Sequence, residues 1–137
     1  MRLQIEKAIR STRRRLAIRG EFLRVEGFSM APTLNPGQIV FVRRGAYRRR
    51  APQRGEVVVA RPEACGRRLM IKRLAGLPHD RIELHGRSWQ LGDDEFFLLG
   101  DDEAGSTDSR SFGPVAGRDL LGPAVALNRP WRFRNAA

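Results

Sequence analysis

A chain of 137 residues is long enough for one domain with a hydrophobic core. Its 41% hydrophobic and 30% charged residues exclude a disordered chain, and no apolar run approaches the about 18 residues of a membrane span. The single cysteine, Cys65, excludes an internal disulfide, and the net charge of +11 favours an anionic partner. The charge is polarised, however, because residues 93–103 hold six acids and no base.

Residues 2–18 predict a helix, because apolar side chains recur along a segment rich in arginine. Gly20 is a typical helix terminator, so residues 1–20 are expected to form a basic arm ahead of the main domain. A solvated helix and an interfacial helix on an anionic membrane are both open for this arm. No apolar stretch of a signal peptide follows its arginines. We therefore expect a cytoplasmic protein, with peripheral contact at a membrane as the alternative.

From residue 21 onward the pattern changes to short apolar runs separated by turns. Gly86 marks a hairpin, and Pro123 indicates that the last strand lies at an edge or contains a bulge. Short strands at this spacing predict an all-β domain over residues 21–137, with a coiled or barrel-like antiparallel sheet. The expected strands cover residues 21–25, 39–42, 56–60, 69–74, 81–84, 88–91, 95–99 and 120–127.

Ser29 lies in a turn between the first two strands of this domain. Gly27 permits unusual backbone angles and Pro32 stiffens the end of the turn, so a hydroxyl and a backbone N–H can face the same point. A serine hydroxyl is a weak nucleophile unless a neighbouring base takes its proton. The two histidines, His79 and His85, lie at turns and are interpreted as surface residues.

Lys72 is the better candidate for that base, because it is one of only two lysines among 26 basic residues and lies in an apolar strand. An arginine cannot lose its proton in a protein, whereas a buried lysine can. To act near neutral pH, the pKa of Lys72 must fall by roughly 2–3 units from about 10.4. A lysine that extends its amine into solvent is the structural alternative.

Three segments carry a resemblance to type I signal peptidases. Residues 27–34, with the sequence GFSMAPTL, resemble the nucleophile box of that family, and residues 71–80 resemble its lysine box. Residues 97–113 resemble the last box, G-D-N…S-x-D-S-R…G, and the order and spacing agree over roughly residues 22–125. The small size and the run STDSRSFGPV are also similar to the nickel superoxide dismutase maturation proteases, which remove a short leader from a cytoplasmic precursor.

The resemblance implies a serine endopeptidase that cleaves a leader or signal sequence from a precursor protein after a small residue. It implies that Ser29 is the nucleophile and Lys72 the general base, and it implies no cofactor and no metal. It also assigns supporting roles. Ser106 orients the lysine amine, Asp108 and Arg110 form a structural pair, the backbones of Ser29 and Gly27 form the oxyanion hole, and Met30, Leu34, Met70 and Ile71 line the substrate pocket.

The sequence departs from the family pattern at two positions. Gly27 stands where many signal peptidases have a hydroxyl residue that donates to the oxyanion, and the loss of one such donor costs about 100-fold or more in rate. Asp102 stands where the family usually has asparagine.

Two other functions stay open at this level. A self-cleaving relative of the LexA-like autoproteases would share the Ser/Lys dyad, with Ala64-Cys65-Gly66 as the nearest candidate for a cleaved segment. A non-catalytic module would instead bind nucleic acid or an anionic membrane through the arm and the arginines of residues 43–50. Tyr47 is the only aromatic residue in that block, so base stacking is poorly provided for and nucleic acid is disfavoured.

Overall fold

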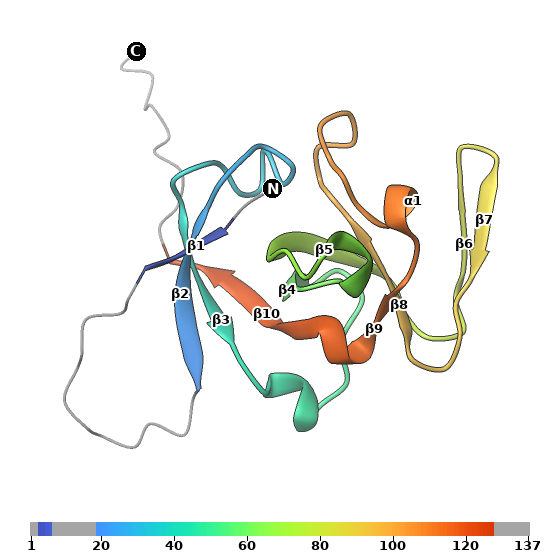
Figure 1. Cartoon of the computed structure of the whole chain (residues 1–137), viewed down its shortest axis with the longest axis horizontal. Helices are drawn as coiled ribbons and strands as arrows, with labels where there is room; N and C mark the ends of the chain where they lie inside the picture. The colour runs from blue at the N-terminus through green and yellow to red at the C-terminus, as the bar shows by residue number, and fades with distance from the viewer. Residues whose placement is uncertain (1–2, 7–18, 128–137) are drawn as a thin grey trace, which may run out of the picture.

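The computed structural model describes residues 3–6 and 19–127 (Figure 1). The strands are β1 (Leu3–Glu6), β2 (Gly20–Val25), β3 (Ile39–Arg43), β4 (Val57–Ala60), β5 (Met70–Gly76), β6 (Arg81–Leu84), β7 (Arg87–Gln90), β8 (Glu95–Leu99), β9 (Val115–Ala116) and β10 (Leu120–Ala126). The helical segments are three short 3-10 turns, η1 (Ala46–Arg48), η2 (Glu63–Cys65) and η3 (Gly117–Asp119), and one turn of α-helix, α1 (Ser109–Phe112).

Eight of the strands form one sheet in the order β1-β2-β3-β10-β4-β5-β8-β9, and β6 and β7 form a separate hairpin. All of the pairings are antiparallel. The predictions of an all-β domain and of a hairpin around Gly86 are therefore confirmed. Over the described residues the sheet is not closed into a barrel, because β1 and β9 are its outer strands.

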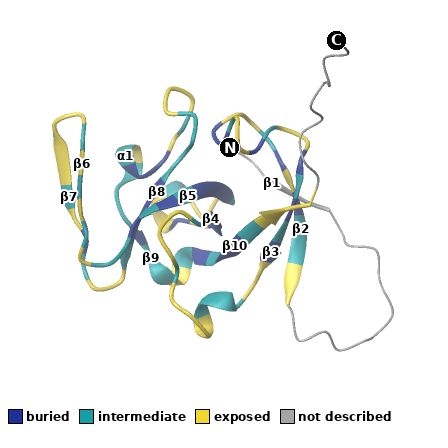
Figure 2. Ribbon diagram, turned by 180° about the vertical axis from the view of Figure 1, so that it is seen from behind, coloured by how far each residue is buried: buried dark blue, intermediate teal, exposed yellow. Residues whose placement is uncertain are grey.

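The core consists of two clusters of buried side chains, visible as the dark segments of Figure 2. The first cluster lies under β2 and β3, where alternate residues such as Leu23, Val25 and Val40 are buried because successive side chains of a strand point to opposite faces. The second lies between β4, β5 and β8. Strand β5 contributes to both clusters, so it occupies the middle of the domain.

The prediction of an N-terminal helix is wrong for Leu3–Glu6, which form β1 and pair with β2 from Leu3 opposite Val25 to Glu6 opposite Phe22. The segment LQIE alternates apolar and polar residues with the period of a strand, and β2 offers it an unpaired edge. The rest of the predicted helix, residues 7–18, lies outside the described residues, as does the end of the chain beyond residue 127.

Strand β10 lies inside the sheet between β3 and β4, so the edge position proposed for Pro123 is wrong and the alternative of a bulge is confirmed. The pairing with β4 shifts between Leu120 and Gly122. At Gly122, which has φ +156, a Cβ would lie 2.9 Å from the backbone carbon of Arg43, so this crowded bulge requires glycine.

Within the described part of the chain, no helix has the length and apolar character needed to cross a membrane.

Candidate active site

Ser29 lies in the loop that joins β2 to β3, and buried side chains hold this loop in place. Met30 and Leu34 belong to the first core cluster, and the Leu34 N–H donates to the Met30 carbonyl at 2.9 Å in a single helical turn. Gly27 enters the loop with φ +76, a conformation that suits glycine. Met30 and Leu34 thus anchor the segment GFSMAPTL in the first core cluster, and Ser29 lies in the turn that they hold in place.

The base of the loop is closed by backbone hydrogen bonds. Val25 N–H donates to the Gln38 carbonyl and Gly37 N–H donates to the Val25 carbonyl, both at 2.8 Å. The buried Gln38 side chain also accepts from the Asn35 N–H at 2.6 Å. Because the two strands are joined directly below the turn, the position of Ser29 is fixed relative to the sheet.

Lys72 lies in β5, an interior strand of the sheet between β4 and β8. It pairs with Val58 of β4 and shares a face of β5 with Met70 and Leu74, both of the second core cluster. Only 1% of Lys72 and 3% of Ser29 are exposed. A lysine amine in such a place is removed from water on nearly all sides, which disfavours its charged form.

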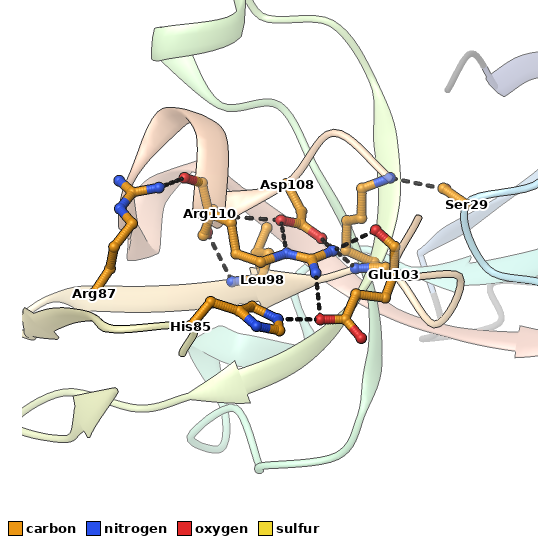
Figure 3. A network of polar contacts seen from close by, with 10 residues as sticks. Ser29, His85, Arg87, Leu98, Glu103, Asp108 and Arg110 are labelled. Atoms are coloured by element: carbon orange, nitrogen blue, oxygen red, sulfur yellow. Dashed lines mark hydrogen bonds and ion pairs between the residues drawn. The ribbon is translucent and has the colours of Figure 1, made fainter. Parts of the chain in front are cut away.

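The Nζ of Lys72 donates a hydrogen bond of 2.8 Å to the Oγ of Ser29 (Figure 3). Burial lowers the pKa of Lys72 from 10.5 to about 8, and the nearby carboxylate of Asp108 acts in the opposite direction. At pH 8 about half of the molecules would therefore hold a neutral amine, which can accept the Ser29 proton through the same contact.

The segment after β8 completes the surroundings of the pair. The Asp102 N–H donates to the Ser29 carbonyl at 2.9 Å, which ties the β2–β3 loop to this segment. A Cβ on Gly100 would lie 2.7 Å from the Ser29 carbonyl oxygen and would also collide with the Ser106 side chain. Gly100 is thus the point where the first and third motifs come into contact, and only glycine fits there.

Asp108 and Arg110 form an ion pair at the start of α1. Arg110 donates from Nη2 at 2.7 Å and from Nε at 2.9 Å to the two carboxylate oxygens of Asp108, which is fully buried. The Gly100 N–H adds a bond of 2.9 Å. Burial alone would raise the pKa of Asp108, but Arg110 and these backbone donors hold it below its usual range. Asp108 therefore stays ionised near Lys72.

Ser106 is half-buried next to Gly100, and its hydroxyl oxygen is buried but makes no hydrogen bond of normal geometry with any described residue. It lies close enough to Asp108 to help lower the pKa of that carboxyl. The expected bond from Ser106 to the Lys72 amine is therefore not formed in this structure. An unsatisfied buried hydroxyl is unusual and invites a functional explanation.

The four predicted pocket residues are all buried, but they belong to both core clusters. Met30, Leu34 and Ile71 pack in the first cluster and Met70 in the second. Neighbours in a strand point to opposite faces, so Met70 shares the face of Lys72 and Ile71 does not. The structure thus places Met70 on the same face of β5 as Lys72, which contacts Ser29, and places Ile71 on the other face.

Sequence reasoning missed the pair formed by Arg73 and Asp101. The guanidinium of Arg73 donates two hydrogen bonds to the Asp101 carboxylate, at 3.2 and 2.6 Å, and one to the Gly55 carbonyl at 2.9 Å. Burial would raise the pKa of Asp101, but Arg73 and the hydroxyl of Thr33 hold it low. The available signal was position alone, since Arg73 follows the lysine and Asp101 follows Gly100 in the third motif.

The network around Asp108 extends to the β6–β7 hairpin, as Figure 3 shows. Arg110 Nη1 lies 3.3 Å from the Glu103 carboxylate, which also pairs with His85 at the hairpin tip. Arg87 donates to the Arg110 carbonyl at 2.7 Å. The hairpin thereby braces the segment that carries Asp108. The side chains of His79 and His85 are 71% and 70% exposed, in keeping with surface histidines.

A buried serine in contact with a lysine of lowered pKa is the kind of site found in hydrolases that activate serine without histidine. A family model described as "Signal peptidase, peptidase S26" matches residues 15–89 and 86–128. The chain therefore belongs to the signal peptidase family, peptidase S26.

Curated relatives carry related names. The mitochondrial inner membrane protease subunit 2 of Danio rerio is 35% identical over 101 residues, which cover 68% of this chain and 55% of that protein. The probable signal peptidase I-2 of Synechocystis is 31% identical over 124 residues, covering 70% and 57%. The mitochondrial ATP-independent inner membrane protease subunit 1b of Arabidopsis thaliana is 32% identical over 118 residues, covering 80% and 69%. The chain spans little more than half the length of the first two relatives.

The buried lysine predicts a pH-dependent effect of Lys72→Met on stability. Between pH 8 and 10.5 the unfolded lysine holds a proton that the folded one has lost, so the wild-type free energy of unfolding rises with pH there. Methionine removes this dependence. The quantity to compare is the free energy of unfolding of Lys72→Met minus that of wild type, measured by urea unfolding. This difference is expected to be about 3 kcal/mol lower at pH 10.5 than at pH 7. A difference that does not change with pH would contradict the lowered pKa.

Proposed function

We propose that this chain is a serine endopeptidase in which Ser29 is the nucleophile and Lys72 the general base. The observation that carries the proposal is the 2.8 Å contact between Lys72 Nζ and Ser29 Oγ. Both residues are almost completely buried from solvent. Membership of the signal peptidase family supports a precursor protein with a cleavable leader or signal sequence as the substrate.

In the first half of the reaction, the neutral Lys72 amine takes the Ser29 hydroxyl proton as Oγ attacks the carbonyl carbon of the scissile bond. The Ser29 N–H is the proposed donor to the developing oxyanion, with the Gly27 backbone as its neighbour. The Lys72 ammonium then gives its proton to the leaving amine, and the C–N bond breaks to leave an ester on Ser29.

In the second half, Lys72 takes a proton from a water molecule that attacks the ester carbonyl, and returns it to Ser29 Oγ as the ester breaks. Asp108 assists by its charge, since a buried carboxylate stabilises the ammonium that forms in each half. That attraction also limits how far the pKa of Lys72 falls. Asp108 thus stabilises the protonated lysine, while burial favours the neutral one.

The narrower features of the substrate stay predictions. Cleavage after a small residue requires a shallow apolar subsite, and Met70 is the predicted pocket residue that shares the face of Lys72. Phe28, the residue before Ser29, is 67% exposed and offers an apolar contact for a leader peptide. A short-leader precursor like those of the nickel superoxide dismutase maturation proteases is the most specific substrate prediction. Contact of the basic arm with an anionic membrane, and a cytoplasmic location, are likewise predictions.

The self-cleaving alternative is less well supported. The candidate segment Ala64-Cys65-Gly66 lies in η2 and its cap, where the Cys65 N–H donates to Pro62 and the Gly66 N–H to Glu63, each at 3.0 Å. A peptide cleaved by the proposed site would instead lie extended as an added strand. Cleavage of a separate precursor is therefore the better proposal.

Loss of either dyad member is expected to lower kcat/KM for a leader-bearing peptide by at least about a thousandfold. Ser29→Ala removes the attacking oxygen, and Lys72→Arg keeps a charge that cannot be released. Lys72→Met removes the base while suiting the apolar site. Ser88→Ala, at an exposed serine of β7, is the matched control and should retain full activity. Cleavage by Lys72→Arg at the wild-type rate would exclude the dyad.

The pH dependence of cleavage should follow the titration of Lys72. Because only the neutral amine can accept the serine proton, kcat/KM is expected to rise with pH to a plateau, with a midpoint near pH 8. Initial rates measured between about pH 6 and 10 provide the profile. A midpoint near 6.5 would instead indicate a histidine base and would contradict the assignment.

Ser106→Ala is expected to slow cleavage without weakening the fold. The Ser106 hydroxyl has no well-formed hydrogen bond, so its removal should change the free energy of unfolding little. If the hydroxyl orients the Lys72 amine during catalysis, kcat should fall by about tenfold or more while KM changes little. Ser106→Thr, which keeps the hydroxyl, should retain part of the rate. An unchanged kcat would leave Ser106 without a catalytic role.

A further inference from the structure

An open hollow at the end of β3 is lined mainly by arginines. This arginine pocket has a volume of about 360 Å³ and is lined by Gly45, Ala46 and five exposed arginines, Arg19, Arg43, Arg44, Arg48 and Arg49. The neighbouring hollow shares Arg44 and Arg48 and adds Arg118, so the positive surface continues beyond the pocket. Nothing in the proposed peptidase reaction uses these residues.

The sheet and the turn after β3 gather the arginines from separate parts of the chain. Gly20 pairs with Arg43, which places Arg19 beside the end of β3. The close approach of the two strands depends on Gly20, where a Cβ would lie 2.7 Å from the Val42 carbonyl oxygen. Gly45 then turns the chain with φ +77, and η1 brings Arg48 and Arg49 to the opposite wall.

Among the residues that the structure describes, only one of the five guanidinium groups has an ion-pair partner. Arg44 lies 2.7 Å from the Glu21 carboxylate, whereas the other four arginines make no ion pair with any described residue. Like charges around one cavity repel each other and lower the stability of the folded chain. An anion in the pocket would remove that repulsion and would be bound for the same reason.

We propose that the arginine pocket binds an anion with two or more phosphoryl groups, either a free oligophosphate or clustered phospholipid headgroups. The planar guanidinium donates two parallel hydrogen bonds that match phosphate oxygens. A terminal phosphate monoester carries about −1.5 to −2 charge at pH 7, and a phospholipid diester carries a single negative charge. A small cluster of such groups therefore suits a hollow in which four arginines have no ion pair with a described residue. A volume of about 360 Å³ is within the usual range for a small-ligand site and suits such a group.

Nucleic acid is a poorer match for the same charges. Binding of single strands relies on aromatic faces on which bases stack. The aromatic residue nearest to these arginines in sequence is Tyr47, which is half-buried, lies 3.4 Å from Glu56 through its hydroxyl and has Arg50 over its ring. Its face is therefore occupied, and phosphate contact is what the pocket can offer.

The pocket lies away from the peptidase site. The Ser29 loop leads into the first residue of β3, and the arginine pocket begins at its last residue, so the two lie at opposite ends of that strand (Figure 1). An anion bound there would not block the dyad. Binding of phosphate and cleavage of peptide are therefore independent properties that can be tested separately.

The test compares two double variants of the full chain with equal loss of charge. Arg48→Gln with Arg49→Gln removes one wall of the pocket, and Arg61→Gln with Arg67→Gln removes two exposed arginines elsewhere. Binding of sodium triphosphate is measured by calorimetry at constant ionic strength, and the fold and peptide cleavage of each variant are checked. The pocket variant should bind about tenfold or more weakly, while the control stays close to wild type.

Vesicles of phosphatidylcholine with and without phosphatidylglycerol distinguish the source of the phosphate. Vesicle binding that requires phosphatidylglycerol, Arg48 and Arg49, and that triphosphate displaces, indicates lipid headgroups. Arginine-dependent triphosphate binding without vesicle binding indicates a free oligophosphate. Equal weakening in both double variants, no saturable binding of triphosphate, or oligonucleotide binding that survives the loss of Arg48 and Arg49 would each overturn the proposal.

Discussion

The hydrogen bond between Lys72 and Ser29 depends on the burial of a lysine amine, and much of the domain is arranged around that burial. An ammonium group is strongly solvated, so a position at the centre of β5 costs free energy unless the group loses its proton. The lowered pKa of about 8 is the chemical result. The stability given up at this residue brings the pKa of the lysine toward the range that the proposed general base requires.

Three segments that are distant in the chain must meet for this contact to form. The β2–β3 loop provides Ser29, β5 provides Lys72, and the segment between β8 and α1 closes over them. A backbone hydrogen bond from the Asp102 N–H to the Ser29 carbonyl joins the first and third of these, and Gly100 allows them to approach. The ion pair of Asp108 and Arg110 and the braced β6–β7 hairpin then hold the third segment against the site.

Charge is divided between the two ends of β3. Near the dyad, the charged groups are paired within the site, as in Arg73 with Asp101 and Arg110 with Asp108. At the far end, five arginines line a hollow, and within the described part of the chain only Arg44 among them is paired with a carboxylate. The positive charge of the arginine pocket would change the pKa of Lys72 if it lay nearby, but it lies at the other end of β3. There it forms a surface suited to phosphate.

The amino-acid sequence by itself determined the all-β class, most strand positions and the identity of Ser29 and Lys72 as the residues of interest. The class and the strand positions follow from a local property, the period of two in the strands. Ser29 and Lys72 stood out through a lysine in an apolar run together with the resemblance of three segments to type I signal peptidases. Local pattern also misled at Leu3–Glu6, where a neighbouring strand edge decided the structure in favour of β1. It left Pro123 undecided, because edge and interior strands differ only in their partners.

The tertiary structure alone decided the contacts. The pairing register of β5 with β4 and β8 set which face Lys72 occupies, and hence that Met70 lies with it and Ile71 does not. The tertiary structure also decided that Asp101 pairs with Arg73 and that the Ser106 hydroxyl has no well-formed hydrogen bond. It likewise brought Arg19 next to the arginines of the turn after β3. Each depends on distances between residues far apart in the chain, which no local pattern encodes.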